Sequence, residues 1–107
     1  MNSASKMKIL SFAGLARRAG KTVLGTDLVL SAIQAEKAFL VLVASDASER
    51  TKKQLCDKCI SHNVKLVLIP ATRDEMAKAA GKNAPVAAIA VTDKNFAKGF
   101  SNLLQAE

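Results

Sequence analysis

Residues 39–44 read Phe-Leu-Val-Leu-Val-Ala, a continuous apolar run with β-branched members, and this stretch decides the fold. A run of this length and composition predicts a strand that is buried on both faces. Two more apolar runs, Val64–Ile69 and Val86–Val91, predict further strands, and Val23-Leu24 is long enough for a short one. The sequence therefore predicts an α/β fold with a central mixed sheet of about four strands that helices cover on both faces.

Helical segments alternate with these strands along the chain. Apolar residues spaced three and four positions apart, such as Ile9, Phe12 and Ala16, predict a helical face that is turned toward a core. Gly25-Thr26-Asp27 offers cap residues for a second helix, which we expect to turn Leu28 inward. The predicted helices are Lys8–Ala19, 26 to about 36, 49 to about 62 after a Ser48 cap, 73–80 after a Thr72–Glu75 capping box, and 94–104 after an Asp93 cap.

The chain has the size and composition of one globular domain. Half of its 107 residues are apolar, which suffices for a single core, and no linker, repeat or low-complexity segment is visible. We therefore expect one domain over residues 1–107, frayed at residues 1–5. No apolar run is long enough to span a membrane, no secretory signal is visible, and two cysteines indicate no disulfide scaffold, so we expect a cytoplasmic protein.

The charge of the chain favours a polyanionic partner. The formal net charge is +7, and a protein that neutralises phosphates gains free energy from the release of condensed counterions. Four Phe and no Trp or Tyr do not supply the aromatic platform on which many single-strand binders stack bases. We therefore expect nucleic acid as the partner, bound by other means than such a platform.

One stretch looks like a phosphate-binding loop but does not match that motif. Ala19-Gly20-Lys21-Thr22 resembles its end, but Gly14 and Gly20 enclose five residues where the motif has four. A helix rather than a strand also precedes it, so nucleotide hydrolysis is not expected.

The cysteine pair does not indicate redox or zinc chemistry. Cys56 and Cys59 lie in the middle of a predicted helix with only His62 nearby, which leaves a zinc ligand set incomplete. We expect both to be buried thiols that act as small apolar side chains. With a single His and no visible catalytic pair, we expect no metal, no cofactor and no enzyme activity.

Basic residues gather ahead of the second helix. Residues 1–24 contain Lys6, Lys8, Arg17, Arg18 and Lys21 and no acidic residue. A helix N-terminus presents free N–H groups and a partial positive charge, which suit a phosphate. The stretch that leads into Gly25-Thr26-Asp27 therefore predicts a phosphate site, and the alternative is a solvated helix end with ordinary surface cations.

Several motifs in order resemble one protein family. They are Gly14-Leu-Ala-Arg-Arg-Ala-Gly-Lys21, Gly25-Thr-Asp-Leu-Val29, Leu40-Val-Leu-Val-Ala-Ser-Asp46, and Ala79-Ala-Gly81 followed by Pro85. Over residues 7–104 the chain resembles the kink-turn-binding ribosomal proteins of the L7Ae/L30e group, most closely their bacterial YlxQ-like branch. The resemblance implies a three-layer α/β/α sandwich, in agreement with the pattern of strands and helices.

The resemblance also implies an RNA site. In that family the second helix enters the major groove of a kinked RNA at tandem sheared G·A pairs, with the pattern Gly-x-Asn-Glu-x-x-Lys. This chain keeps Gly25 but has Asp27, Leu28 and Ser31 in the Asn, Glu and Lys places, and Ala84 where many members have Arg before a proline. The RNA-binding residues that the resemblance and the basic stretch together imply are Arg17, Arg18, Lys21, Gly25, Thr26, Asp27, Ser31, Ser48, Arg73, Lys82, Asn83 and Ala84.

Two functions follow as hypotheses. The first is a monomeric, ribosomal-protein-like binder of structured RNA, kinked or bulged, with ribosomal RNA or another kinked RNA as target and the ribosome as a candidate partner. The second is a protein-interaction module of the translation machinery that has lost specific RNA recognition. No membrane partner is expected, because no basic amphipathic helix carries large apolar residues on its other face.

Overall fold

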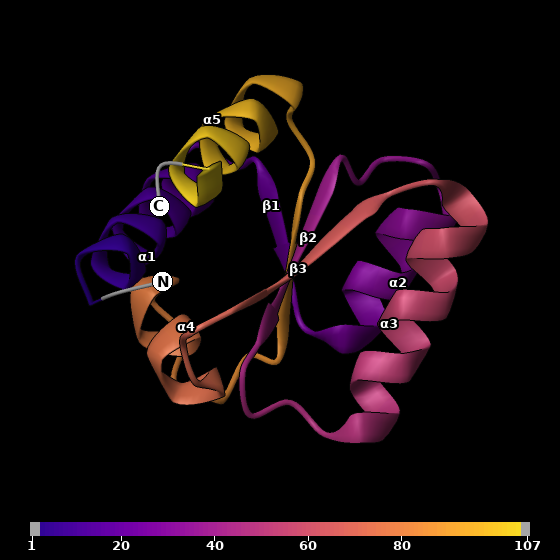
Figure 1. Ribbon diagram of the computed structural model, residues 1–107, viewed down its shortest axis with the longest axis horizontal. Helices are drawn as coiled ribbons and strands as arrows, with labels where there is room; N and C mark the ends of the chain where they lie inside the picture. The colour runs from indigo at the N-terminus through magenta and orange to yellow at the C-terminus, as the bar shows by residue number, and fades with distance from the viewer. Residues whose placement is uncertain (1–2, 106–107) are drawn as a thin grey trace.

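The computed structural model describes residues 3–105, which form five helices and four strands (Figure 1). In chain order these are α1 (Ser3–Arg18), β1 (Thr22–Leu24), α2 (Thr26–Gln34), β2 (Leu40–Ala44), α3 (Glu49–His62), β3 (Lys65–Ile69), α4 (Arg73–Ala79), β4 (Ala88–Val91) and α5 (Lys94–Gln105). None of the described helices is long and apolar enough to cross a membrane.

The four strands form one mixed sheet in the order β1-β4-β2-β3. β2 pairs in parallel with β3, where Leu40 lies opposite Lys65, and antiparallel with β4, where Val41 lies opposite Ala90. β1 pairs antiparallel with the other side of β4. The parallel pair requires a crossover, which α3 supplies. The predicted mixed sheet of about four strands is confirmed.

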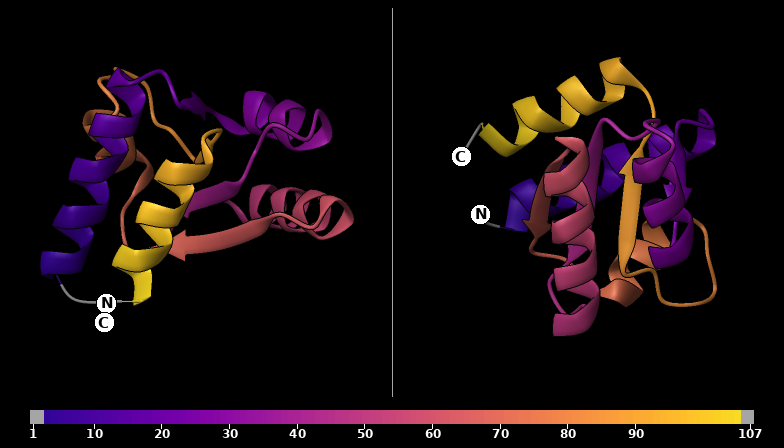
Figure 2. Two further views of the ribbon diagram at one scale, coloured as in Figure 1. Left: turned by 90° about the horizontal axis from the view of Figure 1, so that it is seen from above. Right: turned by 90° about the vertical axis from the view of Figure 1, so that its right-hand side faces the viewer.

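Helices cover both faces of the sheet, as the sequence predicted. α1, α4 and α5 lie on one face and α2 and α3 on the other, so the fold is a three-layer α/β/α sandwich (Figures 1 and 2). Every residue of β2 is at most 1% exposed. Its side chains alternate between two cores: Leu40 and Leu42 contribute to the one under α1, α4 and α5, and Val41 and Val43 to the one under α2 and α3.

The first helix begins at Ser3 instead of the predicted Lys8. The apolar periodicity starts only at Ile9, the first core residue, so the preceding turn carried no signal in the sequence. An ion pair from Lys6 to Glu75 of α4 anchors that turn in the structure. Of the stretch 1–5 that we expected to fray, residues 3–5 are helical, and residues 1–2 lie outside the described part of the chain.

Most of the predicted helix caps are confirmed. The Ser48 hydroxyl accepts a hydrogen bond from the backbone N–H of Thr51, and Asn63 ends α3 in the left-handed region at φ 59°. Thr72 and Glu75 form the predicted capping box of α4. The Asp93 carboxylate accepts the first free backbone N–H groups of α5. These are local hydrogen bonds, which is why the sequence reveals them.

Fewer side chains of α3 are buried than the sequence predicts. Leu55 and Cys59, four residues apart, are buried, whereas Cys56 is exposed and Ile60 is 73% exposed. The expectation that both cysteines are buried is therefore wrong for Cys56. Residues four apart share a helix face, and only the face with Leu55 and Cys59 meets the core under α2. The predicted strand residue Phe39 likewise precedes β2 and is 44% exposed.

α1 packs on α4 at Gly14. A Cβ atom at Gly14 would lie 2.9 Å from the backbone oxygen of Ala79, so the two helices meet there without an intervening side chain. This close approach fixes how α4 lies against the end of α1.

We expect Gly14→Ala to lower the free energy of unfolding by about 1–3 kcal/mol, because the new methyl group meets rigid backbone. Helix propensity alone has the opposite sign and favours Ala by about 1 kcal/mol. Urea unfolding followed by circular dichroism measures the difference. A Gly14→Ala protein that is more stable than the parent would show that α4 shifts freely away from α1.

Candidate nucleic-acid interface

The N-terminus of α2 has no side-chain cap. Its N-cap is Gly25, which has φ 95° and ψ 149° and no hydrogen-bonding side chain. The expectation that α2 begins at Gly25-Thr26-Asp27 is confirmed, with Gly25 as the N-cap, but Thr26 and Asp27 belong to the first helical turn and supply no side-chain cap. Without such a cap, the first N–H groups stay available to an anion, and exposed Asp27 adds a negative charge beside them.

A hollow of about 210 Å³ lies beside this helix end. We call it the β1 hollow, and it is lined by Arg17 of α1, the three residues Thr22, Val23 and Leu24 of β1, Leu28 of α2, and Lys82 from the loop between α4 and β4. Two of the predicted RNA-binding residues, Arg17 and Lys82, thus come together from distant parts of the sequence. The hollow combines an apolar lining with two cations.

Leu28 is 60% exposed, so the prediction that it points inward is wrong. Val29, Ala32 and Ile33 fill the inward face of α2, and Leu28 projects from its first turn into the β1 hollow. An exposed leucine beside cations is an apolar feature of the interface that the sequence did not indicate. The sequence offered no signal for its exposure, because Leu28 lies four residues before the buried Ala32 and this spacing places two residues on the same helix face.

The cations of the basic stretch lie at different places on the surface. The ammonium of Lys21 lies 4.0 Å from the carboxylate of Asp93, and the Lys21 carbonyl accepts a hydrogen bond from the Thr92 N–H. Lys21 therefore turns toward the start of α5, and Arg18 lines a different groove from Arg17. Only Arg17 of the three adjoins the β1 hollow.

The remaining predicted residues lie on the surface, some with local roles. Ser31, Asn83 and Ala84 are exposed. Ser48, also exposed, caps α3. Arg73 contacts Asp46 twice: its backbone N–H donates to the carboxylate at 2.8 Å, and its guanidinium Nε lies 3.6 Å from the same oxygen. Arg73 is thus partly engaged within the protein.

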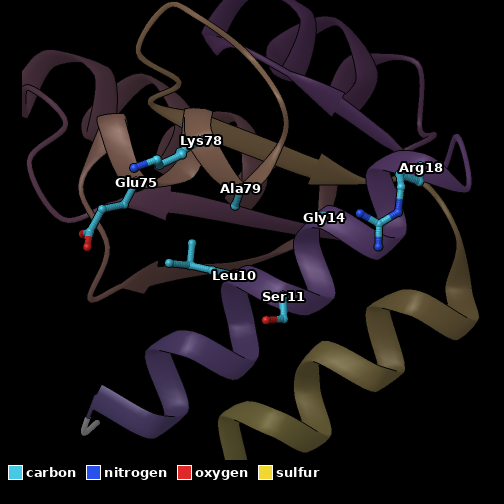
Figure 3. A pocket seen from close by; sticks show the side chains of 7 residues that line it. All are labelled: Leu10, Ser11, Gly14, Arg18, Glu75, Lys78 and Ala79. Carbon is cyan, nitrogen blue, oxygen red and sulfur yellow. The ribbon is translucent and has the colours of Figure 1, made fainter.

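A larger groove of about 550 Å³ lies between α1 and α4 (Figure 3). We call it the α1–α4 groove, and its lining residues are Leu10, Ser11, Gly14, Arg18, Glu75, Lys78 and Ala79. No pattern in the sequence indicates this groove, because it depends on how closely α1 and α4 approach each other. Figure 3 shows Arg18 at one end and Lys78 with Glu75 toward the other.

Both oxygens of the Glu75 carboxylate are engaged within the protein. Oε1 accepts the Thr72 N–H at 2.9 Å, and Oε2 pairs with the Lys6 ammonium. Hydrogen bonding from Lys6 and from the Thr72 backbone holds the pKa of Glu75 below its usual value. Within the groove that it lines, its charge is therefore balanced by the ammonium of Lys6.

The lowered pKa of Glu75 predicts a pH dependence of stability. The charged form is favoured in the folded state, so its contribution is present above the unfolded pKa and is lost as the pH falls through the folded value. We expect Glu75→Gln to destabilise the protein near pH 7 and to differ less from the parent in acid. Thermal unfolding of both proteins across pH 3–7 tests this, and a pH-independent difference would contradict it.

Among residues 3–105 no group of three His, Cys, Asp or Glu side chains is placed to hold a metal ion. Cys56 and Cys59 are both free thiols. Burial, with a smaller effect of Cys56, raises the pKa of Cys59 to about 11. Only the thiolate is the reactive form, so Cys59 is a poor nucleophile, whereas Cys56 is exposed to solvent.

We expect iodoacetamide at pH 8 to label Cys56 in the native protein and to leave Cys59 unmodified until urea unfolds the chain. Peptide mass spectrometry distinguishes the two sites, and Cys56→Ser is the control that should remove native labelling. Equal labelling of both thiols in the native protein would show that Cys59 is accessible.

Two bacterial proteins are similar to this chain along nearly their whole length. The Ribosomal protein L7Ae/L30e/S12e/Gadd45 family matches residues 7–101. An Enterococcus faecium protein described as RNA-binding protein YlxQ is 36% identical over 105 residues, which cover 98% of this chain and 99% of that protein. A Bacillus subtilis (strain 168) protein of the same description is 40% identical over 100 residues, which cover 94% and 98%.

Solved structures support the same fold. A Bacillus halodurans protein of unknown function superposes with a TM-score of 0.85 at 35% identity, over 92% of this chain and 97% of that one. The Giardia lamblia 15.5kD RNA binding protein superposes with a TM-score of 0.75 at 18% identity, over 99% and 86%. At that low identity the second similarity establishes the fold alone. These comparisons agree with the expectation that the chain is not an enzyme.

Proposed function

Because this chain belongs to the Ribosomal protein L7Ae/L30e/S12e/Gadd45 family, we propose that it binds structured RNA, kinked or bulged, with the N-terminus of α2 and the loop between α4 and β4. The observation that carries the proposal is the β1 hollow, where Arg17 and Lys82 meet beside an uncapped helix N-terminus. Similarity to two proteins described as RNA-binding supports it. Ribosomal RNA or another kinked RNA is the target class, and the ribosome is a candidate partner.

The chemistry of the hollow suits an RNA backbone. Arg17 and Lys82 are both exposed, and within residues 3–105 neither forms an ion pair. Their charges and the N–H groups of α2 therefore supply convergent donors to phosphate oxygens. Gly25, Thr26, Ser31, Ser48, Arg73, Asn83 and Ala84 extend the proposed RNA surface, and Arg18 and Lys21 flank it.

Base readout differs from the family pattern. Asp27 accepts hydrogen bonds but does not donate them as Asn does, and Leu28 offers only an apolar contact. Each lost base contact costs about 1–3 kcal/mol of discrimination. The proposed recognition therefore depends on RNA shape and phosphates more than on the identity of individual bases.

A titration of three RNAs at two salt concentrations tests the proposal. They are a kink-turn RNA, the same RNA with its G·A pairs replaced, and a plain duplex. We expect the kink-turn RNA to bind most tightly and the duplex most weakly. Equal affinities for all three would rule out specific recognition, and no binding near physiological salt would favour the protein-interaction module instead.

The same titration locates the phosphate contacts. We expect Arg17→Ala and Lys82→Ala each to reduce the salt slope of binding by about one unit. For Lys21→Ala we expect a smaller change, because Asp93 lies 4.0 Å from its ammonium. An unchanged slope in both Arg17→Ala and Lys82→Ala would exclude the β1 hollow as the phosphate site.

A further inference from the structure

Four cations lie at or just beyond the C-terminal ends of α1 and α4. α1 ends with Arg17 and Arg18, Lys78 lies in the last turn of α4, and Lys82 follows that helix. One pair, Arg17 and Lys82, lines the β1 hollow, and the other, Arg18 and Lys78, lines the α1–α4 groove. The same two segments therefore supply a second cation pair outside the proposed RNA site.

The α1–α4 groove is positively charged although it contains a carboxylate. The negative charge of the Glu75 carboxylate is balanced by the ammonium of Lys6, and its other oxygen accepts a hydrogen bond from the Thr72 N–H. Arg18 and Lys78 are both exposed, and no carboxylate of the described residues lies within 4.0 Å of either. The positive charges of Arg18 and Lys78 therefore favour an anionic ligand.

The space between these cations is apolar. Leu10, Gly14 and Ala79 lie between Arg18 at one end and Lys78 toward the other, and Ser11 adds a hydroxyl group (Figure 3). The backbone contact at Gly14 holds the two helices that carry these cations in place relative to each other. A fitting ligand therefore has negative charges at its ends and an apolar surface between them.

We propose that the α1–α4 groove binds an unpaired segment of the RNA that flanks the kinked duplex. Its phosphates lie at Arg18 and Lys78, and a base packs on Leu10 and Ala79. The inference rests on the proposed function, since the β1 hollow holds the duplex and the consecutive residues Arg17 and Arg18 join the two sites. The bases of a duplex are stacked inside it and do not contact the apolar lining of the groove. The apolar lining therefore favours an unpaired strand.

The test compares kink-turn RNA with blunt ends and the same RNA with a short unpaired extension at the 5′ or the 3′ end. We expect one of the two extensions to tighten binding by the unsubstituted protein about fivefold or more, from phosphate and base contacts together. The double variant Arg18→Ala/Lys78→Ala should lose this gain. The single variant Lys78→Ala leaves every residue of the proposed RNA surface unchanged, so it should lose most of the gain and still bind the blunt RNA within about twofold of the parent.

Lys37→Ala/Lys65→Ala is the matched control. It removes the same charge from exposed residues where β2 and β3 begin, and it should keep the full gain. This inference alone would be overturned if the gain in affinity from the extension persisted in Arg18→Ala/Lys78→Ala. It would also be overturned if blunt RNA bound and neither extension tightened binding. Blunt RNA that does not bind would overturn the proposed function and this inference with it. An acidic peptide that binds the groove in place of the extension would assign it to a protein partner.

Discussion

The complete burial of β2 is the constraint on which the rest of the structure depends. A strand at most 1% exposed along its length needs helices on both faces and a paired strand on each side. β3 takes one side in parallel through the α3 crossover, and β4 takes the other side antiparallel. β1 is left at the edge beside the start of α2, and its residues Val23 and Leu24 give the β1 hollow its apolar wall.

Helix geometry divides the positive charge of the N-terminal stretch. Successive residues of a helix point about 100° apart, so Arg17 and Arg18 line two different cavities. Lys21, which follows the helix, turns toward Asp93 instead. A cluster that is continuous in the sequence thus becomes three separate features of the surface. Each acquires its surroundings from α2, α4 or α5, elements far along the chain.

The features that could be predicted from the sequence are those that local patterns of residues determine. The apolar run of β2 established the layered fold, and the caps at Ser48 and Thr72 are hydrogen bonds within one helix turn. The errors at Leu28 and Cys56 concern which side of a helix meets its neighbours, and that depends on tertiary packing. The α1–α4 groove had no sequence signal for the same reason. Arg17 and Lys82 were expected in one set of RNA-binding residues, from the basic stretch and the family resemblance together, but their meeting in one hollow depends on tertiary packing.

The antiparallel pairing of β1 with β4 constrains the order in which the protein assembles during synthesis. Thr22 pairs with Val91, and these residues are separated by most of the chain. Translation produces the N-terminal half first, but the long loop that this pairing closes must wait until β4 has left the ribosome. The parallel pair of β2 and β3 closes a shorter loop. The β1 hollow, which also needs Lys82, is therefore complete only after β4 is available, so a nascent chain gains this proposed RNA surface late.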